Sequence, residues 1–201
     1  MNWSIITSGP YIEMLHDFLL PTPATEANPN LQFKLPLGDG AVPFIHLGDF
    51  GRYLAWVLSH PTESQGLTLG IAIAHISGPE LAAAYTRATG KPAVFTDEPI
   101  ADWITSHFSA LPSGADTKVG AQSTTDQNSL PLTFGKNFEN WWNLYRSSAG
   151  NKGLITRDYT LLDRILPDRL ASAEDWFRKV SYTGERKQLF WDERVRGPKY
   201  D

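Results

Sequence analysis

The 201-residue chain contains no cysteine, so it has no disulfide, no thiol nucleophile and no thiolate ligand for a metal. Its histidines are dispersed without the spacing of metal ligands, and we expect no metal site. No apolar run is long enough to span a bilayer, and the N-terminus lacks the basic and apolar regions of a secretory signal. The sequence therefore predicts an intracellular protein, cytoplasmic or nuclear, without membrane contact.

The chain also lacks an excess of basic residues, because its formal net charge is -4 and its pI is about 5.7. This argues against direct binding of nucleic acid, which usually requires a basic surface. A hydrophobic content of 41% and a charged content of 20% are typical of a globular domain with a substantial core.

Several catalytic and nucleotide-binding motifs are missing. The sequence has no glycine-rich dinucleotide or phosphate-binding loop and no Gly-x-Ser-x-Gly nucleophile turn. No tyrosine is followed four positions later by lysine, the couple in which lysine lowers the tyrosine pKa for proton transfer in short-chain reductases. The sequence therefore assigns no catalytic residue.

A strand followed directly by a helix is the clearest feature that the chain does contain, in residues 35–58. The strand is predicted from an apolar run that ends before Gly48, and the helix from apolar residues at helical spacing after Asp49. Asp49 is a good candidate for the helix N-cap, since its carboxylate can accept the free N–H groups of the first turn. Such a step is typical of an α/β fold.

The remaining elements follow the same pattern. Further strands are predicted at 3–7, 31–37, 66–74 and 91–96, with a hairpin-type turn at 38–40. Helices are predicted at 11–20, from the capping box Ser77–Glu80 to Gly90, from Pro99 to Phe108, at 138–145, within 154–166 and after the cap Ser172.

Three side chains are candidates for lining a ligand site on the substrate side. His75 follows the end of a predicted strand, whereas His46 is better explained as a core or rim histidine. Trp141 and Trp142 could stack a flat ligand, although adjacent tryptophans on a helix are more often one core and one rim residue.

Several phrases, taken in order, are similar to one family. They are Ser8-Gly9-Pro10-Tyr11, Val42-Pro43-Phe44-Ile45-His46 with Asp49-Phe50-Gly51-Arg52-Tyr53, Ser77-Gly78-Pro79-Glu80-Leu81, Asn137-Phe138 with Trp141-Trp142, and Arg157-Asp158-Tyr159. The chain resembles the C-terminal part of the fungal NmrA-like proteins, atypical members of the short-chain dehydrogenase/reductase superfamily.

The resemblance implies an α/β fold made of the last strands of a doubly wound Rossmann-type sheet plus a smaller, mostly helical C-terminal lobe. Residues 1–109 would hold the end of the NAD(P)-binding sheet and substrate-side elements, 110–135 a flexible excursion, and 136–201 the helical lobe. Gly9, Pro10 and Tyr11 inherit the position that passes the nicotinamide end of a bound NAD(P).

The glycine-rich first half of that family is missing, so the resemblance implies a truncated gene product or fragment that does not bind NAD(P) by itself. Its apolar flank at Trp3, Ile5 and Ile6 is then expected to be exposed. The family implies a redox sensor or regulator acting through a protein partner such as a transcription regulator. An NAD(P)H-dependent reductase of a small carbonyl compound and a cofactor-free interaction domain remain as alternatives.

Overall fold

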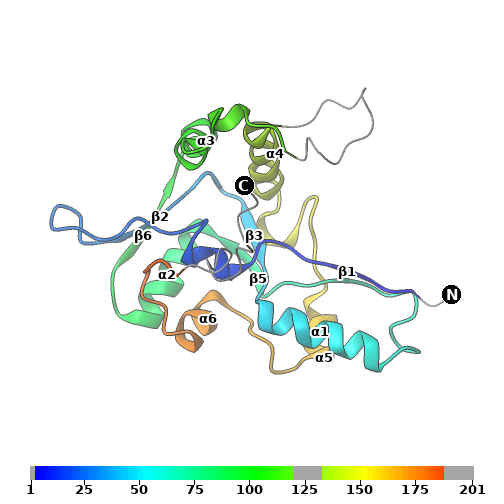
Figure 1. The fold of residues 1–201 in the computed structure, drawn as a ribbon. Helices are drawn as coiled ribbons and strands as arrows, with labels where there is room; N and C mark the ends of the chain where they lie inside the picture. The colour runs from blue at the N-terminus through cyan, green and yellow to red at the C-terminus, as the bar shows by residue number, and fades with distance from the viewer. Residues whose placement is uncertain (1–2, 120–132, 188–201) are drawn as a thin grey trace, which may run out of the picture.

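The computed structural model of the chain describes residues 3–119 and 133–187. The strands are β1 (Ile5–Thr7), β2 (Leu31–Leu35), β3 (Ala41–Phe44), β4 (Thr68–Gly70), β5 (Ala74–Ser77) and β6 (Ala93–Asp97) (Figure 1). The helices are α1 (Leu47–Ser59), α2 (Gly78–Thr89), α3 (Ile100–Phe108), α4 (Phe134–Arg146), α5 (Tyr159–Ile165) and α6 (Ala173–Lys179). Short 3-10 helices are η1 (Ile12–His16), η2 (Gly114–Asp116) and η3 (Ala149–Asn151). The predicted α/β class is confirmed.

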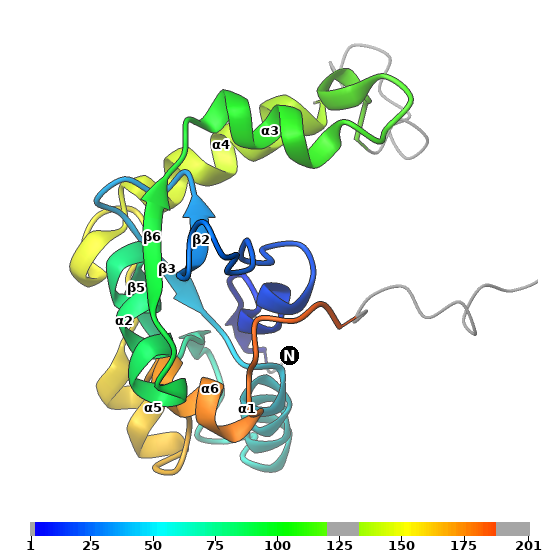
Figure 2. The same cartoon turned by 90° about the vertical axis from the view of Figure 1, so that its left-hand side faces the viewer.

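The strands are hydrogen-bonded in pairs. β1 pairs with β4 and β2 with β6, both in parallel, whereas β3 pairs with β5 in antiparallel. A parallel bridge between Tyr11 and Ile45 joins the chain after β1 to the chain after β3. Figure 2 shows α2 on one side of the strands and the N-terminal segment with η1 on the other, while α3 and α4 lie together beyond the strand ends.

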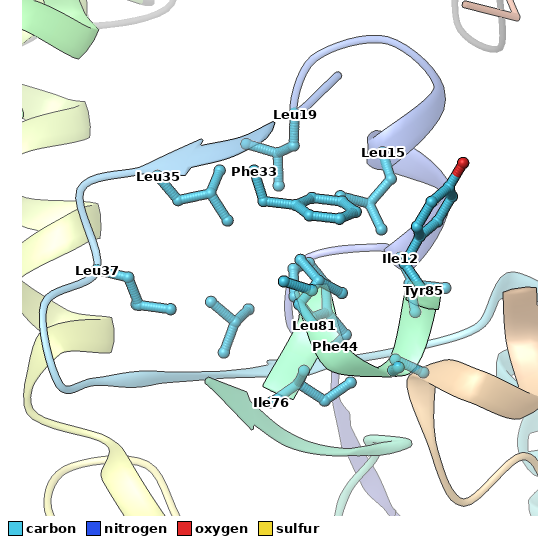
Figure 3. Packing of buried hydrophobic residues seen from close by; sticks show 14 of the residues in the cluster. Ile12, Leu15, Leu19, Phe33, Leu35, Leu37, Phe44, Ile76, Leu81 and Tyr85 are labelled. Atoms are coloured by element: carbon cyan, nitrogen blue, oxygen red, sulfur yellow. The ribbon is translucent and has the colours of Figure 1, made fainter. Parts of the chain in front are cut away.

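The main core lies between the η1 segment, the strands and α2. In β2, alternate residues point inward, as the period of a strand with one buried face requires. Figure 3 shows the converging side chains, which are Ile12, Leu15, Leu19, Phe33, Leu35, Leu37, Phe44, Ile76, Leu81 and Tyr85. Trp142 of α4 and Trp176 of α6 belong to the same cluster. Burial of each large apolar side chain contributes about 1.5–3 kcal/mol, so this cluster dominates the stability.

A second, smaller core lies between α1, β4 and α5. It contains Tyr53, Leu69 and Leu162, and the Tyr53 hydroxyl donates to the Leu162 carbonyl at 3.1 Å. Tyr53 of α1 is therefore buried against α5 and also hydrogen-bonded to it, while Phe50 and Trp56 of α1 pack against the same core.

The expected exposure of the β1 flank is confirmed for two of its three residues. Trp3 is 54% and Ile5 48% exposed. Ile6 instead packs against the second core, so its predicted exposure was wrong. Successive strand residues point to opposite faces, which explains why Ile6 differs from its neighbour. Within the described residues, β1 is paired along one edge only.

Local capping signals are confirmed where they were strongest. The Ser77 hydroxyl accepts from the Glu80 N–H at the start of α2, and Gly90 ends that helix with φ 72°. A left-handed residue at this position suits glycine, which has no Cβ. Ser172 likewise accepts from the Asp175 N–H at the start of α6.

The predicted cap at Asp49 was wrong. α1 begins at Leu47, so Asp49 lies inside its first turn, and the Leu47 N–H is taken by Glu13 Oε1 at 3.2 Å. The same Glu13 oxygen lies 2.6 Å from His46 Nδ1. A carboxylate from a distant segment therefore satisfies the helix end that the sequence assigned to Asp49.

Asp49 instead binds the C-terminal half of the chain. It is buried, its Oδ2 accepts from the Leu170 N–H at 2.9 Å, and its Oδ1 accepts from Arg52 at 3.2 Å. Its role is a tether between α1 and the segment that leads to α6.

Three other predicted elements differ from the structure. The turn at 38–40 does not close a hairpin, because β2 pairs with β6 and β3 with β5. The segment 11–20 contains only the short η1 rather than a full helix. The single strand predicted at 66–74 is divided into β4 and the start of β5.

The break between β4 and β5 leaves three consecutive buried residues outside regular pairing. The Ile71 carbonyl accepts from Arg157 Nε at 3.3 Å, and the Ala72 and Ile73 carbonyls accept from Arg169 Nη1 at 3.2 and 2.7 Å. Buried carbonyls need such partners. Two arginines of the helical C-terminal part therefore stabilise an interrupted strand.

Half of the predicted flexible excursion 110–135, residues 120–132, lies outside the described part of the chain. Its described ends are close together, since the Phe134 N–H donates to the Thr117 carbonyl at 2.9 Å and Lys118 forms a bridge with Thr133. The flexibility and the proposed lobe boundaries stay predictions.

Replacing Asp49 should separate tethering from catalysis. We expect Asp49→Ala to lower the free energy of unfolding by about 1–3 kcal/mol, because it leaves the half-buried Leu170 N–H without its acceptor. Asp49→Asn keeps an acceptor oxygen and should cost less. Urea unfolding measures both, with exposed Asp39→Ala as the matched control. Equal losses for Asp49→Ala and Asp39→Ala would contradict the tether.

Candidate ligand site at the carboxyl ends of strands β1 and β4

A cavity of about 440 Å³ opens where the parallel strands β1 and β4 end. The register pairs Thr7 with Gly70, so both strands finish at the same level. Ligands of α/β folds bind beyond the carboxyl ends of their strands, and this volume is within the usual range for small-ligand sites. The cavity is therefore the candidate site.

The cavity lies between two walls. One wall consists of the end of β1 with Ser8 and of all three residues of β4, where Thr7, Ser8 and Thr68 provide hydroxyl groups, and the other is the segment 154–158 before α5. Leu69, Ile155 and Leu161 add apolar surface. The mixture offers hydrogen-bond donors beside a small apolar wall.

Arg157 is the main charged group in the lining. Its Nε donates to the Ile71 carbonyl and its Nη1 to the Thr156 carbonyl, at 3.3 and 3.0 Å. Its side chain packs over Gly70, where a Cβ would lie 2.9 Å from the Arg157 Cδ. Glycine at the end of β4 thus creates the space that the arginine occupies.

The backbone of Arg157 is held as firmly as its side chain. Asn151 Oδ1 accepts from the Arg157 N–H at 2.7 Å, and Asn151 Nδ2 donates to the Arg157 carbonyl at 2.9 Å. One amide side chain therefore fixes both polar groups of this residue and positions it at the cavity.

The charge of Arg157 is retained in this half-buried place. Burial lowers the pKa of the guanidinium from its ordinary value, but an arginine this basic stays protonated. Asp158 is the carboxylate nearest in sequence, and its Oδ1 accepts from the Leu161 N–H at the start of α5. Among the described residues, Arg157 forms no ion pair.

Gly9, Pro10 and Tyr11 follow this rim directly but are outside its lining. A Cβ on Gly9 would lie 2.6 Å from the Pro43 carbonyl oxygen, so backbone packing already requires glycine there. Pro10 is buried, and Tyr11 packs partly against the second core. Their role at a nicotinamide ring stays a prediction, and Thr7 and Ser8 are the residues of this turn that reach the cavity.

His75 is fully hydrogen-bonded within the fold. Nε2 lies 2.9 Å from the Ile155 carbonyl, which can only accept, so Nε2 carries the proton. Nδ1 then accepts from the Tyr159 hydroxyl at 2.6 Å. Burial lowers the pKa of His75 and raises the pKa of Tyr159 to about 12. Each group is thus held neutral, and the pair braces the segment that carries Arg157.

The two tryptophans are divided between core and rim. Trp142 is fully buried, and its ring packs edge-on against Trp103 and Trp141. Trp141 is half-buried and packs against Tyr145. Trp142 therefore presents no free face to a ligand here, and neither ring lines the cavity described above.

Sequence reasoning did not single out Arg157 as a site residue, although the residue belongs to a phrase that carries the family resemblance. The glycine at position 70, which leaves space for the Arg157 side chain, could have indicated this site. Residues so far apart in sequence are brought together only by the fold. No group of three or more histidines, aspartates or glutamates suited to a metal occurs within 3–119 and 133–187. None of the helices in these two ranges is long and apolar enough to cross a membrane.

The strand-end cavity, the parallel pairs and the helices define a Rossmann-like α/β protein. Solved structures with this fold include NmrA, a negative transcriptional regulator, in complex with NADP, at 14% identity and a TM-score of 0.58. The match covers 90% of this chain and 52% of NmrA. NmrA in complex with NAD gives 13% identity, the same TM-score and the same coverage.

A nucleoside-diphosphate-sugar epimerase from Staphylococcus aureus is similar at 13% identity and a TM-score of 0.59, over 89% of this chain and 52% of the epimerase. At these identities the likeness shows the fold alone, and the chain spans about half the length of these proteins. No protein-family model and no curated protein matches the chain.

The His75–Tyr159 pair predicts a dependence of stability on pH. Burial lowers the pKa of His75 in the folded state, so the folded protein favours the neutral imidazole. The contribution of neutral His75 to stability is therefore complete above about pH 6.5 and is lost as the pH falls below that value. The free energy of unfolding should therefore decrease from about pH 7.5 to about pH 5.5. His75→Gln, whose amide can bind both partners, should reduce the slope.

Urea unfolding at several pH values measures this difference. The pKa values of His16 and His107 are also lowered by burial, and both residues remain in the variant, so the comparison isolates His75. His60→Gln serves as the matched control. Identical slopes for the wild-type chain and His75→Gln would contradict the assignment.

Proposed function

We propose that this chain is the nicotinamide-side and substrate-side half of an NmrA-like NAD(P)-binding unit, and that the complete unit acts as a redox-sensing regulator through protein contacts. The observation that carries the proposal is the cavity beyond the carboxyl ends of β1 and β4, which the Thr7–Ser8 turn enters. It is supported by the similarity in fold to NmrA in complex with NADP and with NAD.

The residues present fit one end of a dinucleotide. Thr7 and Ser8 offer exposed polar groups at a strand end, beside a cavity large enough for a small ring. Pyrophosphate binding needs backbone N–H groups behind a glycine-rich turn, and this sequence contains no such turn. We therefore expect the 201 residues by themselves to bind NAD(P) negligibly. When bound in the complete unit, the dinucleotide would supply the redox state that is sensed.

The unpaired edge of β1 is where we propose that the rest of the sheet continues. Trp3 and Ile5 are exposed beside it, and Leu54 and Leu58 on α1 are 42% and 74% exposed. An open strand edge with apolar neighbours favours pairing with another strand. The chain's coverage of about half of its structural neighbours supports this reading.

We prefer regulation to reduction because of the chemistry of the cavity. Its polar side chains are aliphatic hydroxyls, Arg157 and Asp158, and the Asp158 carboxylate accepts from the Leu161 N–H. Tyr159, which has the imidazole of His75 beside it, lies outside the lining. Proton transfer to a carbonyl substrate would need a donor of suitable pKa within reach.

Titration with two uncharged nucleosides tests the nicotinamide assignment. Reduced nicotinamide riboside at millimolar concentration should shift the backbone amide resonances of Thr7, Ser8, Gly9 and Tyr11, because its ring fits beside this turn. Adenosine, the matched control, should leave them unchanged. Equal shifts with both nucleosides, or no shift at residues 7–11, would contradict the proposal.

Calorimetric titration with NADPH tests the second part. We expect no binding at micromolar concentration by the 201-residue chain, since the phosphate anchor is missing. Micromolar binding by a monomer would require a complete dinucleotide site within these residues and would overturn the proposal that the chain is one half of the unit.

A further inference from the structure

We propose that Arg157 forms an anion subsite with the hydroxyls of Ser8 and Thr68, and that this subsite takes the carboxylate or phosphate group of a small organic ligand. The inference rests on the proposed function only in sharing its cavity. It adds the charge of a small second ligand, which would bind in the same cavity beside the nicotinamide ring.

The first argument is the contrast between Arg157 and the other arginines of the described chain. Six of them form ion pairs, namely Arg52 with Asp49 and Asp168, Arg87 and Arg178 with Glu174, Arg146 with Asp97, Arg169 with Asp163, and Arg186 with Asp17. Arg164 and Arg157 form none within the described ranges. Arg164 is exposed on α5, where water solvates it, but Arg157 is half-buried.

The second argument is the cost of that burial. A cation that is partly removed from water is stabilised by a counter-ion or by hydrogen bonds. Among residues 3–119 and 133–187, Arg157 has only the neutral carbonyls of Ile71 and Thr156 as acceptors, which bind Nε and Nη1. Its Nη2 has no hydrogen bond to a described residue. A positive charge and free N–H groups are therefore available at the cavity.

The third argument is the polarity of the lining. The hydroxyls of Ser8, Thr68 and Thr156 form no hydrogen bond with the described residues and can donate, as the guanidinium must. Asp158 is the one carboxylate among the described lining residues, and its Oδ1 accepts from the Leu161 N–H. A group of donors around a cation matches an anionic oxygen, and charge-assisted bonds of this kind are the stronger ones.

The fourth argument is size. The cavity of about 440 Å³ holds more than a bare ion, and Leu69, Ile155 and Leu161 provide an apolar wall beside the donors. The ligand class is therefore a small organic acid or phosphate ester whose apolar part lies against that wall.

The test is an NMR titration of the 201-residue chain with inorganic phosphate, and separately with acetate, at constant ionic strength. We expect saturable shifts of the Arg157 side-chain Nε–Hε resonance and of the Ser8 and Thr68 amides. The probe that binds more tightly identifies the ligand as a phosphate or a carboxylate. No saturable shift with either probe would overturn the proposal.

Variants show whether the binding belongs to this site. Arg157→Gln should weaken anion binding by about tenfold or more, whereas Arg164→Gln, which removes the same charge from the exposed face of α5, should not. Gly70→Ala keeps the charge but places a Cβ against the Arg157 side chain, and it should also weaken binding. Equal effects of Arg157→Gln and Arg164→Gln would indicate non-specific attraction and would contradict the subsite.

The outcome is independent of the nicotinamide assignment. Anion binding without resonance shifts from reduced nicotinamide riboside would support the subsite and overturn the proposed function. Shifts from the riboside without anion binding would support the proposed function and overturn the subsite. If Arg157→Gln does not fold, the wild-type resonance shifts and Gly70→Ala decide the matter.

Discussion

Three buried carbonyls between β4 and β5 set the constraint on which the rest of the structure depends. At Ile71, Ala72 and Ile73 the chain leaves regular pairing, and the carbonyl oxygens need donors because water cannot reach them. Arg157 and Arg169 supply those donors from the helical C-terminal part. The interruption of one strand thus determines where the second half of the chain docks, and Asp49 strengthens the docking by binding the Leu170 N–H.

The two arginines perform the same backbone task but differ in electrostatics. Arg169 lies against Asp163, which neutralises its charge, and its guanidinium also lies 5.4 Å from the centre of the Tyr159 ring. Arg157 forms no ion pair with a described carboxylate and lines the cavity at the strand ends. A structural requirement of the fold thereby leaves one cation available for a ligand.

The sequence predicted those features that depend on neighbours along the chain. The cap at Ser77, the left-handed Gly90, the helix after Pro99 and the α/β class are local or periodic signals, and all are present. The errors arose where a distant segment decides. Glu13 caps α1 in place of Asp49, and the packing of Arg157 on Gly70 joins residues from opposite halves of the chain. No periodicity encodes such contacts, so the cavity and its charge could not be predicted.

The bridge between Lys118 and Thr133 has a consequence for how the gene can vary. Backbone hydrogen bonds hold the chain at Thr117–Lys118 against the chain at Thr133–Phe134, so these two points are anchored beside each other. The closure entropy of a flexible insert between two such anchors changes slowly, by about 0.6 kcal/mol for each doubling of length. An epitope or reporter peptide inserted between the anchors should therefore add little closure cost.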